Sequence, residues 1–426
     1  MDKKIIKSII VRQQEFFSTV EFIHRPLMIE ESANYVLVGL RRAGKSYMLY
    51  QIIHDMIANG HKKEEMLFVN FEDERISDIR KDELQDIIDS YRELYDMKPI
   101  IFLDEIQNIE GWEHFARRLA DEKYRVYVTG SNAHMLSREI ASTLGGRYQI
   151  REVFPFSFTD YLKWHGIEIE NNWEYSSVRQ NIRRLFDDYF YYGGIAEIFP
   201  LNDKRGWLTA LYQKVLYSDV AIRNKVRNER GLNLLVKKLA DSVLQPTSVK
   251  RMQDTLTGIG HKVTRDTITN FLQYLHDAYI VFPVSNFTDG AKEREGNRKH
   301  YFYDNGILNL FLFQPETKLL ENIVALTLIK LYGEEAVFYY KRNAEVDFYV
   351  PSQSVAIQVA YDLELQATKD REVGNLIALT SYINTVEKLM IITMDTEDTI
   401  RQGNLLIEVI PVWKWLMQLN SKDIKC

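Results

Sequence analysis

The sequence predicts a multidomain α/β protein whose first domain is a parallel sheet covered by helices on both faces. Short apolar runs of high β propensity alternate with segments of helical periodicity between residues 35 and 153, and this alternation is typical of parallel sheets. A glycine-bounded loop at residues 39–46 directly follows the first of these strands. The chain has 426 residues, which is too long for one ordinary core, so further domains are expected.

The overall composition is that of a globular protein, with 46% hydrophobic and 27% charged residues. No apolar run approaches the ~20 residues that a membrane helix needs. Charges interrupt residues 1–12 too often for a signal peptide. The single cysteine, Cys426, excludes an internal disulfide and a cysteine zinc site. We therefore expect a cytoplasmic protein.

The glycine-bounded loop has the pattern of a phosphate-binding P-loop (Walker A), Gly-x4-Gly-Lys-Ser, between a strand at residues 35–38 and a helix at 47–57. That context counts against a chance match in a polar loop. The helix directs its positive end at the phosphates, Lys45 is expected to reach the β- and γ-phosphates, and the Ser46 hydroxyl is expected to bind Mg²⁺. The predicted nucleotide-binding residues are Gly39, Leu40, Arg41, Arg42, Ala43, Gly44, Lys45, Ser46 and Tyr47.

A second motif (Walker B) lies about sixty residues downstream, where the apolar strand at residues 99–103 runs into Asp104 and Glu105. The Asp104 carboxylate is expected to hold Mg²⁺ directly or through water. Glu105 is expected to act as general base on the attacking water. An intervening strand and the second acid indicate the additional-strand class of P-loop ATPases.

The fourth predicted strand ends in Thr129-Gly130-Ser131-Asn132. At this edge of the sheet a polar side chain can contact the γ-phosphate or orient the attacking water. Ser131 and Asn132 are the two candidates for this role, and the sequence does not choose between them.

Together these motifs resemble the bacterial and archaeal AAA-type ATPases that join a P-loop domain to a C-terminal domain of unknown function. The matching motifs are Gly39-x4-Gly44-Lys45-Ser46, Leu103-Asp104-Glu105-Ile106-Gln107, Thr129-Gly130-Ser131-Asn132, Leu144-Gly145-Gly146-Arg147-Tyr148, Phe154-Pro155-Phe156-Ser157-Phe158 and Tyr192-Gly193-Gly194-Ile195. The resemblance covers nearly the whole chain, although the family more often has proline where Ile195 or Ala196 stands. It implies that Arg147 senses nucleotide. A structural arginine paired with an acid is the alternative.

Four domains are predicted: an ATPase core at 1–155, a helical lid or linker at 156–230, a winged helix at 231–303 and a nuclease-like α/β domain at 304–426. In the lid, the aromatic residues between 186 and 192 are interpreted as a core, in preference to a base-stacking surface.

The winged-helix prediction rests on three helices followed by a hairpin. The first helix spans residues 234–244, and Ser248 and Thr264 are expected to be the N-caps of the second and third. Residues 201–300 carry 17 Lys and Arg against 10 Asp and Glu, which hints at a polyanionic partner such as double-stranded DNA. Solvated helix faces, or contacts with other domains or proteins, are the alternatives. The expected DNA contacts are Lys262, Arg265, Asn270, Arg298 and Lys299.

The last third resembles the restriction-endonuclease-like fold, whose metal-dependent members carry an acid on the first helix, an aspartate on the second strand and Glu-x-Lys on the third. Glu321 and Asp347 occupy the first two positions, but Gln358 stands where the glutamate is expected and Ala360 where the lysine is expected. Losing a hard anionic ligand and the activating cation removes the chemistry of cleavage. We therefore expect an inactive, nuclease-shaped module for binding or signalling, with a protein as a candidate partner.

The predicted function is Mg²⁺-dependent binding and hydrolysis of ATP, with nucleotide state coupled to domain movement. A nucleotide-gated interaction protein with little turnover and an ATP-dependent nuclease are the alternatives. ATP is favoured over GTP because the sequence has no Asn-Lys-x-Asp motif to read guanine.

Overall fold

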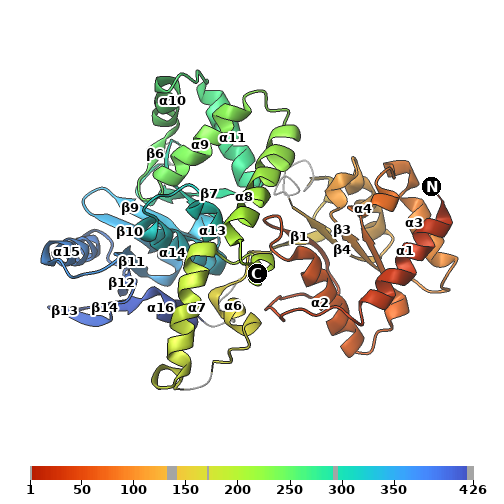
Figure 1. Cartoon of the computed structure of the whole chain (residues 1–426), viewed down its shortest axis with the longest axis horizontal. Coiled ribbons are helices and arrows are strands. Elements are labelled where there is room, and N and C mark those ends of the chain that lie inside the picture. The colour runs from red at the N-terminus through yellow and green to blue at the C-terminus, as the bar shows by residue number, and fades with distance from the viewer. Residues whose placement is uncertain (1, 132–141, 170–171, 291–295, 420–426) are drawn as a thin grey trace. The chain divides into compact units, whose positions relative to one another are not determined.

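The computed structural model describes residues 2–131, 142–169, 172–290 and 296–419. It divides into two compact units, Met1–Phe154 and Pro155–Lys425, and each is considered by itself (Figure 1). No helix in the described part of the chain is both long and apolar enough to cross a membrane.

The described strands of the first unit form a five-stranded parallel sheet in the order β2-β3-β4-β1-β5. These strands are β1 (Asn34–Val38), β2 (Met66–Asn70), β3 (Ile100–Asp104), β4 (Arg125–Gly130) and β5 (Tyr148–Glu152). Because β4 pairs with both β1 and β3, it separates the strand before the P-loop from the strand that ends in Asp104. This is a P-loop type of parallel α/β sheet, as predicted.

Helices cover both faces of this sheet. They are α1 (Lys3–Phe16), α2 (Lys45–Ala58), α3 (Gln85–Arg92) and α4 (Trp112–Asp121). The chain crosses the sheet in one direction from β1 to β2 and in the opposite direction from β2 to β4. Right-handed crossovers therefore place α2 on one face and α3 and α4 on the other, and Figure 1 shows α2 and α4 on opposite sides of β3 and β4.

The second unit is built on a nine-stranded mixed sheet in the order β13-β14-β12-β11-β10-β9-β7-β8-β6. Its strands are β6 (Thr247–Ser248), β7 (Val281–Asn286), β8 (Asn297–Phe302), β9 (Phe338–Lys341), β10 (Glu345–Val350), β11 (Val355–Val359), β12 (Lys388–Thr393), β13 (Asp398–Gln402) and β14 (Leu405–Pro411). Parallel pairing of Ser285 with Phe338 joins β7 to β9. The predicted boundary at 303/304 therefore lies inside one continuous sheet.

The helices of the second unit surround this sheet. They are α6 (Phe158–Trp164), α7 (Val178–Tyr192), α8 (Lys204–Lys214), the π-helix η8 (Val215–Ile222), α9 (Glu229–Asp241), α10 (Val249–Gly258), α11 (Arg265–Asp277), α13 (Asn305–Asn309), α14 (Glu316–Tyr332), α15 (Gln366–Tyr382) and α16 (Val412–Gln418). Ser248 and Thr264 cap α10 and α11, each side chain accepting from a backbone N–H three residues on, as the sequence predicts.

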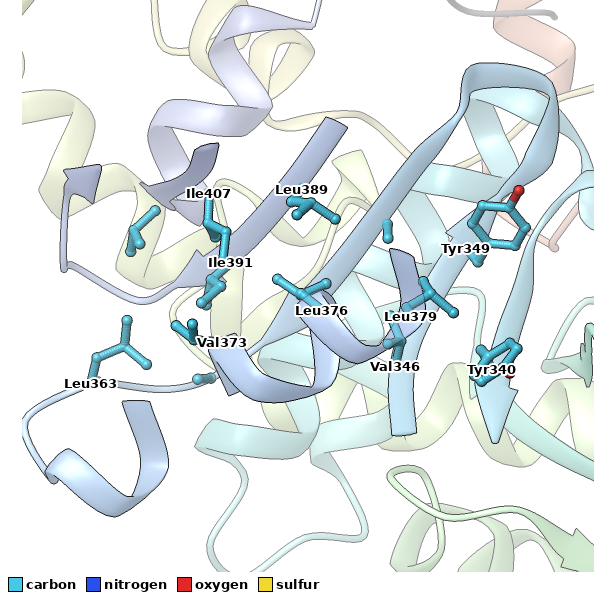
Figure 2. Close-up of a cluster of buried hydrophobic side chains, with 13 residues drawn as sticks. Tyr340, Val346, Tyr349, Leu363, Val373, Leu376, Leu379, Leu389, Ile391 and Ile407 are labelled. Atoms are coloured by element: carbon cyan, nitrogen blue, oxygen red, sulfur yellow. The ribbon is translucent and has the colours of Figure 1, made fainter. Parts of the chain in front are cut away.

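One face of the C-terminal strands is buried under α15. Figure 2 shows Val373, Leu376 and Leu379 of this helix directed at side chains of the sheet, among them Ile391 and Ile407. Leu376, Leu379, Ile391 and Ile407 are fully buried. Apolar packing of this kind, worth about 1.5–3 kcal/mol for each fully buried side chain, fixes α15 on the sheet.

The aromatic residues of α7 are core residues. Phe186 and Phe190 are fully buried, and the ring centroid of Phe186 lies 5.2 Å from that of Phe158. The helix ends at Gly193, whose φ of +78° favours glycine. A Cβ on Gly194 would approach the Phe156 carbonyl oxygen within 2.2 Å. The positive φ of Gly193 and the close approach at Gly194 together explain the Gly-Gly pair. The buried Asp304 carboxylate accepts from the Gly194 N–H at 2.8 Å.

Candidate nucleotide site

Three predicted motifs meet at one edge of the five-stranded sheet. The P-loop follows β1, Asp104 is the last residue of β3, and Ser131 follows β4 directly. Because these strands are parallel neighbours, their carboxyl ends lie together, which is where open α/β sheets bind ligands.

The P-loop backbone depends on conformations that favour glycine. Gly44 has φ +97° and forms the N-cap of α2, and Gly39 has φ +151°. A Cβ on Gly39 would lie 2.1 Å from the Val153 carbonyl oxygen, so any side chain there would push the loop away from the end of the sheet. Arg42 also has positive φ, at +68°. Such turns direct backbone N–H groups into a concave anion site.

Lys45 is held inside this loop. Its Nζ donates to the carbonyl oxygens of Gly39 at 3.2 Å and Leu40 at 3.1 Å. The same Nζ lies 3.7 Å from Glu105 Oε1, and the Lys45 side chain is only 3% exposed. A buried ammonium needs anionic or carbonyl partners, and phosphate oxygens are stronger partners than the two carbonyls that hold it here.

Asp104 and Ser46 form the predicted metal-binding pair. Ser46 Oγ donates to Asp104 Oδ2 at 2.8 Å, and Thr129 Oγ1 donates to Asp104 Oδ1 at 2.5 Å. Burial raises the pKa of Asp104 to about 6, although both hydrogen bonds and the positive charge of Lys45 oppose that rise. A buried carboxylate beside a hydroxyl is a hard oxygen pair, and it fits Mg²⁺.

Glu105 adopts a backbone conformation that is uncommon for a side-chain-bearing residue, with φ +53° and ψ +42°. Its N–H donates to Thr129 Oγ1 at 2.9 Å, and its Oε2 accepts from Gln107 Nε2 at 2.5 Å. Burial raises the pKa of the Glu105 carboxyl, but Lys45 and Gln107 outweigh burial, so that pKa lies below its usual value. Glu105 is therefore an ionised carboxylate at neutral pH, as a general base must be.

Of the two residues predicted to follow β4 as γ-phosphate sensors, Ser131 is buried and its Oγ lies 3.4 Å from Gln107 Nε2. Asn132 lies outside the described residues. Tyr47, at the start of α2, is half exposed.

Arg25 is a residue of the site that sequence reasoning missed. One guanidinium nitrogen donates to the Ala43 carbonyl oxygen at 3.2 Å and the other to that of Phe154 at 2.8 Å. Gln51 of α2 pairs with the Arg25 backbone in both directions. The arginine therefore ties the P-loop to the end of the first unit, and no spacing pattern in the sequence marks it.

The structure does not bring Arg147 to this site. Arg147 directly precedes β5, and its carbonyl oxygen accepts from Asn34, the first residue of β1. It therefore lies at the edge of the sheet opposite the P-loop. Its Nε donates to Asp121 at 2.5 Å. Within this chain Arg147 is therefore paired with an acid, as the structural alternative predicted.

Lys299 is not the exposed DNA contact that was predicted. It is 1% exposed, and its Nζ donates to Glu321 Oε1 at 2.9 Å and to Asp347 Oδ1 at 3.1 Å. The prediction placed it at the tip of a hairpin, but it lies on β8, which is an interior strand of the nine-stranded sheet. Of the other predicted contacts, Lys262, Arg265 and Asn270 are exposed and Arg298 is partly buried.

The three residues of the predicted degenerate nuclease site are brought together around this lysine. Gln358 Oε1 accepts from the Asp347 N–H at 2.7 Å, and Tyr301 donates to Glu321 at 2.6 Å. The Lys299 ammonium bridges Glu321 and Asp347, the two carboxylates that a metal ion would have to bridge.

The first unit joins a P-loop type of parallel sheet to the Walker A and Walker B motifs, which is the arrangement of a P-loop nucleotide-binding domain. A family model described as an AAA domain matches residues 31–162, and a model of a domain of unknown function, DUF8612, matches residues 183–318. The chain is 31% identical to the uncharacterized protein MJ1544 of Methanocaldococcus jannaschii over 97% of this chain and 96% of that protein. It therefore belongs to the same family as MJ1544.

Two further proteins are similar to this chain. An uncharacterized protein of Haemophilus influenzae is 26% identical over 90% of this chain and 94% of its own length. A solved structure, the Walker-type ATPase PABY2304 of Pyrococcus abyssi, aligns with 65% of this chain and 90% of that chain, at 13% identity and a TM-score of 0.41.

Proposed function

We propose that the first unit binds ATP with Mg²⁺ and hydrolyses it to ADP and phosphate. The observation that carries the proposal is the convergence of a phosphate-binding lysine, a metal-binding pair and a carboxylate base. Ser46 Oγ contacts Asp104 at 2.8 Å, and Lys45 Nζ lies 3.7 Å from Glu105.

In the proposed reaction the oxygen of a water molecule bonds to the γ-phosphorus while the bond from that phosphorus to the bridging β-phosphate oxygen breaks. Glu105 accepts the proton of the water. Lys45 and the N–H groups of the P-loop stabilise negative charge on the phosphates. Asp104 and Ser46 would hold Mg²⁺, which neutralises phosphate charge when it is bound.

The direct test is phosphate release from ATP by the full chain. We expect turnover with ATP and Mg²⁺ and its loss when EDTA removes the metal ion, because the proposed reaction needs Mg²⁺ to neutralise phosphate charge. GTP at the same concentration tests the preference for adenine. Release that is insensitive to EDTA would contradict the proposed metal site.

A nucleotide-gated interaction protein with little turnover is the second candidate. The contact of Lys45 with Glu105 favours it, since that contact engages the proposed base and the proposed phosphate ligand with each other. Tight retention of ATP, with phosphate release no faster than the uncatalysed rate, would select this candidate.

We further propose that residues 231–303 form a winged helix that docks on double-stranded DNA. The support is the order of elements, three helices followed by a hairpin, with β6 paired to β8. Lys262 and Arg265 are exposed around the start of α11, and Asn270 is exposed within it. A helix with polar residues near its N-terminus is the usual element for major-groove contact.

Arg265→Glu is expected to weaken binding to double-stranded DNA and to reduce the log–log salt slope by about 0.9 for the lost phosphate contact. Fluorescence anisotropy at several salt concentrations measures both quantities. Arg401→Glu is the matched control, because Arg401 is exposed on β13, at the other end of the sheet from β6. Equal effects of the two variants would contradict a specific DNA face on α11.

We propose that residues 304–426 are nuclease-shaped but do not cleave, and serve instead as a binding or signalling module, for which a protein is one candidate partner. Two observations support the loss of cleavage. Gln358 supplies a neutral amide in place of a carboxylate, and the Lys299 ammonium already bridges Glu321 and Asp347. The ammonium therefore already neutralises the two carboxylates that a divalent cation would need as ligands.

A further inference from the structure

Gln107 lies two residues beyond Glu105, in the short 3₁₀ turn η4 (Ile106–Asn108). Its amide nitrogen donates to Glu105 Oε2 at 2.5 Å and lies 3.4 Å from Ser131 Oγ. It therefore joins the end of β3 to the end of β4 at the nucleotide site. None of the roles assigned above uses this side chain.

The orientation of the Gln107 amide follows from its partner. A carboxylate only accepts hydrogen bonds, so the NH₂ end must face Glu105, and a flipped amide would set two oxygens against each other. The carbonyl oxygen Oε1 is consequently directed elsewhere. It is buried and has no hydrogen-bond partner among the described residues.

A buried acceptor without a partner is uncommon in a folded protein. Here the acceptor is the oxygen of the same Gln107 side chain whose nitrogen donates to Glu105, the proposed base. A water molecule that donates one hydrogen to Gln107 Oε1 and the other to the Glu105 carboxylate would satisfy both acceptors. Such a water would be held in one orientation, with its oxygen lone pair free to attack.

The Glu105 carboxylate also needs a hydrogen-bond partner that stays in contact with it when nucleotide binds. The groups that face its carboxylate are Lys45 of α2, Arg41 of the P-loop, the neighbouring Asp104, and Ser131 and Gln107. Lys45 is the proposed γ-phosphate ligand, and Arg41 is already paired with Glu72 at 2.6 Å. When Lys45 turns to phosphate, Gln107 and Ser131 remain to fix the carboxylate, and Ser131 is itself a candidate γ-phosphate sensor.

We infer that Gln107 is a positioning residue for ATP hydrolysis, with its amide nitrogen holding the Glu105 carboxylate and its carbonyl oxygen orienting the attacking water. The inference rests on the proposed ATPase function. It adds a residue that neither contacts the phosphates nor accepts the proton.

Gln107→Met tests this role because methionine has nearly the same length but neither donates nor accepts as glutamine does. We expect kcat to fall about 10- to 100-fold, the effect of a misplaced reacting group, while KM and equilibrium ATP binding stay within about twofold. Gln107→Ala should behave alike. Gln85→Met is the control, since Gln85 makes a similar side-chain hydrogen bond to Asp89 on α3.

The double variant with Glu105→Gln gives a readout that a merely structural role would not produce. Because an oriented water and a fixed carboxylate help only while Glu105 can take the proton, adding Gln107→Met to Glu105→Gln should lower kcat much less than Gln107→Met lowers it in the wild type. Independent losses that multiply would overturn the inference, and so would a rise in KM at unchanged kcat. Melting curves that show both Gln107 variants unfolded would assign the residue to stability and also overturn it.

Failure of the inference differs from failure of the proposed function. Wild-type protein that releases no phosphate removes the ATPase function itself. Wild-type protein that turns over ATP, with Gln107→Met at the same rate, leaves the ATPase in place and removes only the role of Gln107.

Discussion

Lys299→Met lowers the free energy of unfolding of the second unit by about 3–5 kcal/mol, the cost of breaking a buried ion pair by removing one partner. Methionine leaves Glu321 and Asp347 facing each other without the ammonium that now lies within 3.1 Å of both. Urea unfolding of the full chain, followed by tryptophan fluorescence, measures the loss. Five of the six tryptophans lie beyond residue 155, so the signal reports chiefly on this unit.

Two variants separate the loss of the ion pairs among Lys299, Glu321 and Asp347 from the effect of replacing a lysine by methionine. Lys341→Met removes a lysine from an ion pair with Glu345 in which both side chains are about half exposed, and it should change stability by only about 0–1 kcal/mol. Adding Glu321→Gln to Lys299→Met should recover part of the loss, because one of the two uncompensated charges is gone. A loss no larger than that of Lys341→Met would show that the cluster contributes no net stability.

The loss should also depend on pH. Burial raises the pKa of Glu321 to about 7, and the attraction of Lys299 opposes that rise. In the variant the opposition is gone, so the folded pKa rises further above the unfolded value of about 4.3. A carboxyl whose pKa is higher in the folded than in the unfolded state lowers the free energy of unfolding increasingly as pH rises from the unfolded pKa to the folded pKa. The difference between variant and wild type should therefore be small near pH 4.5 and largest above pH 7.

The nucleotide site was readable from sequence because its chemistry lies in short contiguous motifs. Gly39, Gly44 and Lys45 are fixed by one loop, and Asp104 and Glu105 by one strand end, so spacing alone places them. Arg25 and Lys299 differ, because their partners are 18 to 129 residues away in the chain. Their roles depend on which strands become neighbours, and local patterns do not encode that.

The same limit explains how far the fold was predicted. Apolar strands and capped helices follow local rules, and the caps at Ser248 and Thr264 were predicted correctly. The pairing of β7 with β9 is a contact between segments about fifty residues apart. Because hydrophobic periodicity reports only which face of a strand is buried, it gave no sign that the hairpin joins the C-terminal sheet.

Glu105→Gln is expected to keep ATP binding and to lower kcat by about 10²- to 10⁴-fold, the usual contribution of a general base. The amide keeps the size of the side chain but cannot accept the proton of water at neutral pH. It also removes a negative charge 3.7 Å from Lys45, so that charge no longer competes with phosphate for Lys45, and ATP should bind as tightly or more tightly. Phosphate release and equilibrium binding of a fluorescent ATP analogue measure the two effects.

Lys45→Ala should show the opposite pattern, because it removes the cation that faces the phosphates and leaves Glu105 without its nearest positive charge. ATP binding should weaken enough for turnover to disappear at substrate concentrations that saturate the wild type. Lys62→Ala, at an exposed lysine of the same unit, controls for loss of charge. If Glu105→Gln turned over ATP at the wild-type rate, the base would have to be another group. If Lys45→Ala bound ATP normally, the P-loop would not be the phosphate site, and the proposed nucleotide chemistry would fail with it.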